Sequence, residues 1–129
     1  MRINTISRYI FVAICLLQSL GIYAQNITSD TIKVKAGKLS ELLGSNVDLI
    51  KNLTLKGEIN GTDITTIRSM KKLSVLNLAD VKIIKGGVFI SSIYNDKIDF
   101  SNNEIPEEMF YSKDNLTSVI LPEDINAIG

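Results

Sequence analysis

The chain has 129 residues, with 14 Lys and Arg against 14 Asp and Glu, one Cys, and no His or Trp. A chain of this length forms one domain at most, and its balanced charge argues against a nucleic-acid-binding surface, which is usually basic. Without His, imidazole general-base catalysis and His-ligated zinc are excluded, and a single Cys cannot close an intramolecular disulfide. We therefore expect no cofactor, no metal centre and no nucleic-acid partner.

Residues 1–24 have the pattern of a secretory signal peptide. Arg2 and Arg8 supply positive charge, residues 9–22 form a short, mostly apolar stretch, and Ala24 precedes the expected cleavage before Gln25. A helix of this stretch spans about 21 Å, which is short of the ~30 Å hydrocarbon core. An uncleaved anchor and lipidation at Cys15 are the alternatives. Cleavage leaves residues 25–129, without a Cys and without a membrane span. We expect this mature chain to be secreted, periplasmic or on the cell surface.

Residues 25–50 are interpreted as an N-terminal cap for the elements that follow. The alternation in residues 31–35 predicts a strand. Leu39, Leu42 and Leu43 then fall on one helical face, and Gly44 ends that short helix.

Residues 51–129 contain a repeated apolar pattern. Four alternating segments begin at residues 53, 76, 98 and 119, so their spacings are 23, 22 and 21: Leu53–Leu55, Leu76–Leu78, Ile98–Phe100 and Val119–Leu121. A period of this length holds one strand and a return path, and stacked units of this kind form a parallel sheet. The pattern predicts an α/β fold, a short leucine-rich repeat solenoid of about three to four turns with parallel strands.

The return segments differ from one another. Thr62 or Asp63 is expected to cap a second short helix that buries Ile64 and Ile67. Residues 85–97, which include Gly86 and Gly87, predict an irregular insertion rather than a regular turn.

Several segments resemble a known family. Residues 105–110 resemble its I-P-x-x-x-F turn, residues 116–122 and 125–129 resemble its L-T-S-V-x-L-P-x-x-I-x-x-I-G unit, and residues 76–81 resemble its L-D-L-S-D-A segment. The chain thus resembles the BspA-like leucine-rich repeat proteins, which are exported surface proteins of the Bacteroides type. The resemblance implies a protein-binding or adhesion module whose partner is a protein or another cell-surface macromolecule.

The expected binding surface is the outward face of the strands, because solenoids commonly bind partners on such a face. The residues predicted to lie there are Asn52, Thr54, Lys56, Val75, Asn77, Lys97, Asp99, Ser118 and Ile120. No catalytic residue is expected among them.

Two other functional hypotheses stay open. The chain could be a truncated N-terminal fragment of a longer surface repeat protein, without activity of its own. It could also be an exported hydrolase that uses paired carboxylates, although Glu107 and Glu108 are adjacent in the sequence and no second layer that would form a cleft is predicted. The acidic cluster of residues 96–108 is interpreted as a solvated loop, because its order does not match a calcium-binding loop.

Overall fold

The computed structural model describes residues 31–129. The predicted signal peptide, Cys15 and residues 25–30 of the predicted cap lie outside the described residues. The elements, in chain order, are β1 (Thr31–Val34), α2 (Leu39–Leu43), the 3₁₀ helix η1 (Gly44–Asp48), β2 (Asn52–Ile59), α3 (Gly61–Ser69), β3 (Val75–Ile83), β4 (Glu104–Ile105), β5 (Ser118–Ile120) and β6 (Ala127–Ile128).

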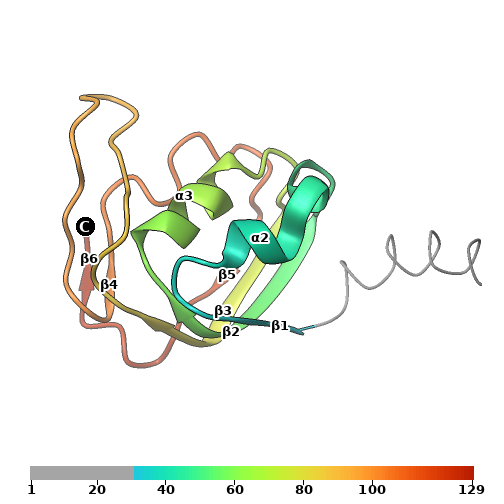
Figure 1. Cartoon of the computed structure of the whole chain (residues 1–129), viewed down its shortest axis with the longest axis horizontal. Helices are drawn as coiled ribbons and strands as arrows, with labels where there is room; N and C mark the ends of the chain where they lie inside the picture. Colours follow the sequence, from blue (N-terminus) through green and yellow to red (C-terminus); the bar gives the residue numbers. More distant parts are fainter. Residues whose placement is uncertain (1–30) are drawn as a thin grey trace, which may run out of the picture.

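The main sheet has four parallel strands in the order β1-β2-β3-β5. The helices α2 and α3 contact each other and pack on the same side of this sheet (Figure 1). An α/β fold with parallel strands and two short helices near the N-terminus is therefore confirmed. The strand predicted at residues 31–35 is also present, and it joins this sheet as its first strand.

The strand register shows which positions repeat. Thr31 pairs with Thr54 and Thr54 with Asn77, so both offsets in residue number equal 23, whereas Asn77 pairs with Ile120, an offset of 43. The predicted strands that begin at residues 53, 76 and 119 are confirmed. The predicted spacings of 22 and 21 are wrong, because β3 pairs directly with β5 and Ile98–Phe100 forms no strand.

Ile98–Phe100 belongs instead to a long loop, residues 84–103. The N–H of Ile98 donates to the carbonyl of Phe89, and Lys97 bridges Ile90 in antiparallel fashion, so the segment pairs within the loop. The loop returns to its starting point, since the N–H of Asn103 donates to the carbonyl of Ile83. In Figure 1 it extends from the end of the molecule where β4 and β6 lie. Its local pairing removes the apolar alternation of residues 98–100 from the sheet.

A second parallel pair, β4 and β6, lies beyond the main sheet. Glu104 pairs with Ala127 and Ile105 with Ile128. Neither short strand was predicted as a strand. Asn103 links β4 to the end of β3 through its N–H, and its carbonyl accepts from the N–H of Asn126. Through this link β4 lies between the end of β3 and β6.

The core lies between the sheet and the helices. Inward residues alternate along the strands, and the buried set includes Leu53, Leu55, Leu76, Leu78, Ile64, Ile67 and Phe89. In β3 the inward positions change phase, from Leu76 and Leu78 to Val81 and Ile83, where the register with β2 shifts. Beside this shift, Gly57 has a φ of 108°, and a Cβ there would lie 2.2 Å from the carbonyl oxygen of Val34. Only glycine therefore allows β1 to approach β2 at this position.

Asn60 caps α3, not Thr62 or Asp63 as predicted. The Asn60 side chain accepts from the N–H of Thr62, and Asp63 completes a capping box by accepting from the N–H of Asn60 at 3.0 Å. The other contacts of the buried Asp63 carboxylate reach the turn before α2, because it accepts from the N–H groups of Gly37 at 2.6 Å and Leu39 at 2.9 Å. One side chain thus joins the starts of both helices.

Within residues 31–129, no helix is both long enough and apolar enough to cross a membrane.

Candidate functional site

The strand register gathers seven of the nine predicted surface residues on the outward face of the main sheet. One row contains Asn52, Val75 and Ser118, and the next contains Thr54, Asn77 and Ile120. Their side chains are exposed or half-buried, because the alternate residues of the same strands point into the core. Lys56, the seventh residue, is exposed further along β2. We call this set of seven residues the outward face.

Lys97 and Asp99 do not lie on the outward face, so their prediction as sheet residues is wrong. Both sit in the 84–103 loop, where they form an exposed ion pair of 2.8 Å. The error has a physical cause, since the alternation in residues 98–100 satisfies contacts within the loop rather than a place in the sheet.

Sequence reasoning missed two residues of this surface, Thr31 and Lys33. The register places Thr31 beside Thr54 and Lys33 beside Lys56. On its other side, Lys56 pairs with Asp80 of β3. This row therefore has two lysines, on β1 and β2, followed by a carboxylate on β3. The signal was present in the sequence, because positions 31, 54 and 77 are separated by equal steps of 23. This repeat was missed because residues 25–50 were interpreted as a separate cap rather than as part of the sheet.

A shallow hollow of about 510 Å³ opens beside the outward face, between β3 and the loop that follows β5. The pairing of β3 with β5 ends at Asn77, and further along the chain β4 lies between the end of β3 and β6. Neighbouring strands are about 4.8 Å apart. Because β4 lies between them, the end of β3 and the chain that leads from β5 to β6 diverge towards twice that distance. The inserted strand therefore creates the hollow.

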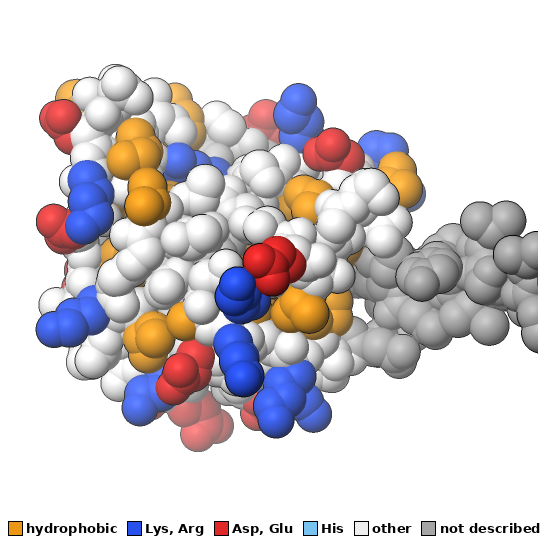
Figure 2. All heavy atoms as spheres, viewed as in Figure 1, with side chains coloured by type: hydrophobic (Ala, Val, Ile, Leu, Met, Phe, Trp, Pro, Cys, Tyr) orange, Lys and Arg blue, Asp and Glu red, His pale blue; other side chains and the backbone are white. Residues whose placement is uncertain are grey.

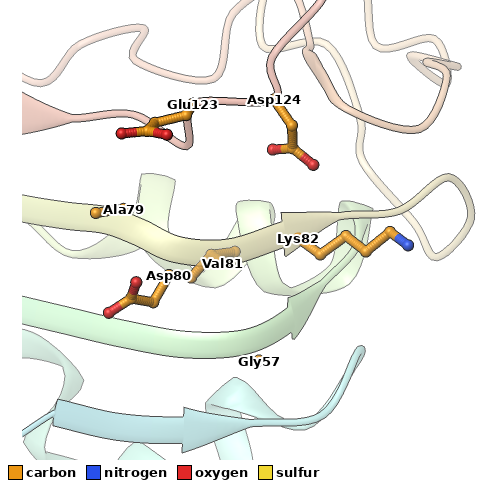
Figure 3. A pocket seen from close by; sticks show the side chains of 7 residues that line it. All are labelled: Gly57, Ala79, Asp80, Val81, Lys82, Glu123 and Asp124. Carbon is orange, nitrogen blue, oxygen red and sulfur yellow. The ribbon is translucent and has the colours of Figure 1, made fainter.

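The lining of this hollow is rich in charge. Figure 3 shows Glu123 and Asp124 on the loop across from β3, with the Asp124 side chain turned toward that strand. Asp80 and Lys82 lie on the β3 side. Among residues 31–129, no three His, Cys, Asp or Glu side chains converge closely enough to hold a metal ion. The hollow is thus suited to polar or cationic groups of a partner surface.

The 84–103 loop is fastened to the body through Glu108. Its carboxylate accepts from the Ser91 hydroxyl at 2.6 Å and from the N–H of Ser92 at 2.7 Å, and it lies 3.6 Å from the guanidinium of Arg68. The hydrogen bond from Ser91 is the largest cause that lowers the pKa of Glu108. Burial opposes this shift, and the N–H of Ser92 and the charge of Arg68 add to it. Glu108 therefore stabilises the loop in its ionised form.

Arg68 and Phe89 complete this anchor. The Arg68 guanidinium lies over the Phe89 ring at 4.4 Å from the centroid and donates to the carbonyl of Ile90. Phe89 is itself buried. These contacts hold the base of the loop against α3.

The loop exposes large apolar side chains. Val88, Ile93 and Tyr94 are 59%, 55% and 73% exposed. A smaller hollow of about 280 Å³ lies at the loop base, lined by Ser91, Tyr94, Asp96, Lys97, Ile98, Asp99, Glu107 and Glu108. The acidic cluster predicted as a solvated loop thus partly lines this hollow. Glu108 lines this hollow while its carboxylate accepts from Ser91 and Ser92.

The rest of the visible surface is mixed. Figure 2 shows charged side chains of both signs spread over one face of the molecule, with apolar side chains in small, separate patches.

No model of a known protein family matches the chain, and no curated protein has a significantly similar sequence.

Proposed function

We propose that this chain is an exported leucine-rich repeat module, a short solenoid that binds a protein or another cell-surface macromolecule through its outward face. The observation that carries the proposal is the strand register, in which Thr31, Thr54 and Asn77 repeat at equal steps of 23 in the sequence. Equal steps place equivalent side chains side by side in one surface row. The resemblance of residues 105–129 to leucine-rich repeat segments supports the same interpretation.

The chemistry of the outward face suits a macromolecular partner. Its rows combine small polar side chains with Val75 and the 48% exposed Ile120. Such a surface offers hydrogen bonds along its length and one apolar contact near its edge. The Ile93 and Tyr94 side chains offer a second contact, since exposed aromatic side chains often anchor interfaces.

A binding screen with matched variants tests this proposal. The full chain is titrated against matrix proteins and glycans, and the partner that saturates is then titrated against three variants. Asn77→Arg introduces a bulky charge in the centre of the outward face, Tyr94→Ser removes the exposed ring of the loop, and Lys71→Ala changes an exposed residue outside both regions.

The expected result is a dissociation constant about tenfold or more higher for Asn77→Arg, because central interface residues carry most of the binding energy. Lys71→Ala should bind like the parent. The proposal fails if no partner saturates, or if Asn77→Arg leaves the affinity unchanged. An effect of Tyr94→Ser alone would place the interface on the loop and also contradict the proposal.

Export is tested separately from binding. The pattern of residues 1–24 leads us to propose cleavage before Gln25. Mass spectrometry of the exported chain should then give the mass of residues 25–129. An intact N-terminus would contradict cleavage. A lipid on Cys15 would show that the chain is attached to a membrane through that residue instead of being cleaved before Gln25.

A further inference from the structure

The two ends of the main sheet both expose strand edges. Within the described residues, β1 pairs only with β2, and β5 pairs only with β3. Each therefore has one side whose backbone N–H and carbonyl groups have no strand partner in this part of the chain. Unpaired edges of this kind are templates for adding another strand.

The hydrophobic layer is also incomplete at both ends. The inward residues of β2 and β3 are buried, whereas Val119 in β5 and Leu121 after it are only half-buried. At the other end, Ile32 in β1 is half-buried as well. A further strand at either edge would cover apolar surface that residues 31–129 leave partly exposed, which is favourable.

The two ends carry opposite charge. Residues 31–41 contain Lys33, Lys35 and Lys38 and one acidic residue, Glu41, which forms an ion pair with Lys38. Residues 114–129 contain Asp114, Glu123 and Asp124 and no basic residue. Two β1 edges would repel each other, and so would two β5 edges, whereas a β1 edge and a β5 edge attract.

We propose that a second copy of this chain docks its β1 edge alongside the β5 edge of the first, as a parallel strand that extends the sheet. The occupant is a second copy because one molecule carries both complementary edges. This inference does not depend on the proposed binding function, since it concerns the ends of the sheet and not its outward face.

The existing register gives the geometry of the contact. Within one molecule, Thr31, Thr54, Asn77 and Ile120 lie side by side in one row of the sheet. If the row continues into the second copy, Thr31 of that copy lies beside Ile120. Its Ile32 then lies beside Leu121, so that two half-buried apolar residues cover each other. Its Lys33 lies beside Pro122, on the same segment as the exposed residues Glu123 and Asp124.

The contact joins two different surfaces, so it leaves one β1 edge and one β5 edge free in every assembly. Such a heterologous contact continues beyond the dimer unless the rotation closes a ring. The charge contribution also weakens with salt, because the Debye length falls from about 8 Å at physiological ionic strength to about 3 Å at 1 M.

Charge-reversal variants test the proposal by sedimentation velocity over a wide range of concentrations. Lys33→Glu/Lys35→Glu makes both ends acidic, and Glu123→Lys/Asp124→Lys makes both ends basic. All four side chains are exposed, so each variant should keep its fold, which far-ultraviolet circular dichroism checks. Lys71→Ala/Lys72→Ala changes two exposed lysines away from both edges and serves as the control.

We expect the mass of the parent to rise with concentration past that of a dimer, and to rise less at 1 M salt. Each charge-reversal variant alone should associate roughly tenfold more weakly or worse, because it places like charges on the two edges that meet. An equimolar mixture of the two variants should recover association, because each acidic edge again meets a basic one. The control should behave like the parent.

Three results would overturn the proposal. The first is a parent that stays monomeric at the highest soluble concentration. The second is association that stops at a dimer, which indicates a two-fold symmetric contact. The third is a mixture of the two variants that associates no better than either variant alone.

Discussion

The carboxylate of Asp63 accepts backbone N–H groups at the starts of both helices, from Gly37 and Leu39 at the start of α2 and from Asn60 before α3. Because Asp63 is buried, its removal leaves the buried N–H of Leu39 without a partner and removes the acceptor of the part-buried N–H groups of Gly37 and Asn60. We predict that Asp63→Ala lowers the free energy of unfolding by about 2–4 kcal/mol. Urea denaturation measures this loss. Asp48→Ala, at an exposed acidic residue of η1, should change stability by less than about 0.5 kcal/mol.

Glu108 gives a pH-dependent prediction at the same scale. The Ser91 hydroxyl, more than any other group, lowers its folded-state pKa below the ordinary value of 4.5. A carboxyl with a lowered folded-state pKa stabilises the fold above its unfolded pKa, and this contribution is lost as pH falls through the folded value. The stability difference between the parent and Glu108→Gln should therefore be constant above about pH 5 and shrink below pH 4.5.

Chemical denaturation of both proteins at a series of pH values measures this difference. A difference that stays constant down to the acid transition, or that grows as pH falls, would show that the Glu108 carboxylate is not held by Ser91 and Arg68 as described.

At the scale of elements, the strands β2 and β3 carry the core. Leu55 and Leu78 are almost fully buried on their inward sides. Replacing either with Ala should cost about 2–5 kcal/mol, because the cavity is only partly filled by relaxation. Ala79→Ser, one position along β3 and exposed, is the matched control. If Leu78→Ala denatures at the same urea concentration as the parent, its inward position is wrong.

The 84–103 loop divides into a buried base and an exposed tip. Phe89 is buried beneath Arg68, so Phe89→Ala should destabilise the chain by about 3–5 kcal/mol. Tyr94 is 73% exposed, and Tyr94→Ala should change stability by no more than about 0.5 kcal/mol. Urea denaturation of the two variants compares these effects. Equal destabilisation by both would contradict the division.

The same elements show how far the sequence predicts this fold. Apolar alternation found β2, β3 and β5, because an inward residue at every second position is the physical requirement of a half-buried strand. It misplaced Ile98–Phe100, where the same alternation serves contacts within the loop. It missed β4 and β6, because two paired residues leave no period to detect. The cap at Asn60 was missed although its capping box with Asp63 is a local pattern, whereas the contacts of Asp63 to Gly37 and Leu39 are not visible in local sequence.

For the candidate surface, the repeated pattern placed seven residues on the sheet correctly and two residues incorrectly. Rows such as Thr54 and Asn77 follow from the repeat, since equal offsets place residues side by side. Lys97 and Asp99 were assigned to the face because a regular period was extended through the loop. The hollow beside Asp80 and Asp124 depends on β4 entering between two neighbouring segments, which no local pattern records.

At the scale of the molecule, the strands of the main sheet follow one another in chain order except that β4 is skipped, and each strand is stabilised mainly by those beside it. The central strands β2 and β3 have neighbours on both sides and buried inward residues. β5 is half-buried at best, and β6 is exposed, with Ile128 at 70%. Opening of the C-terminal strands therefore exposes little additional apolar surface.

We predict a gradient of hydrogen-exchange protection that falls from β2 and β3 towards β5 and β6. Amides at Leu55 and Leu76 should exchange only through global unfolding, because both residues are buried and lie in the two central strands, whose opening exposes the core. Amides at Val119 and Ile128 should exchange through smaller local openings. Native-state exchange in dilute protein measures this order, and equal protection at all four positions would contradict it. Raising the protein concentration should protect Val119 and leave Leu55 unchanged if a second copy docks on the β5 edge, so the gradient also shows whether that edge is covered.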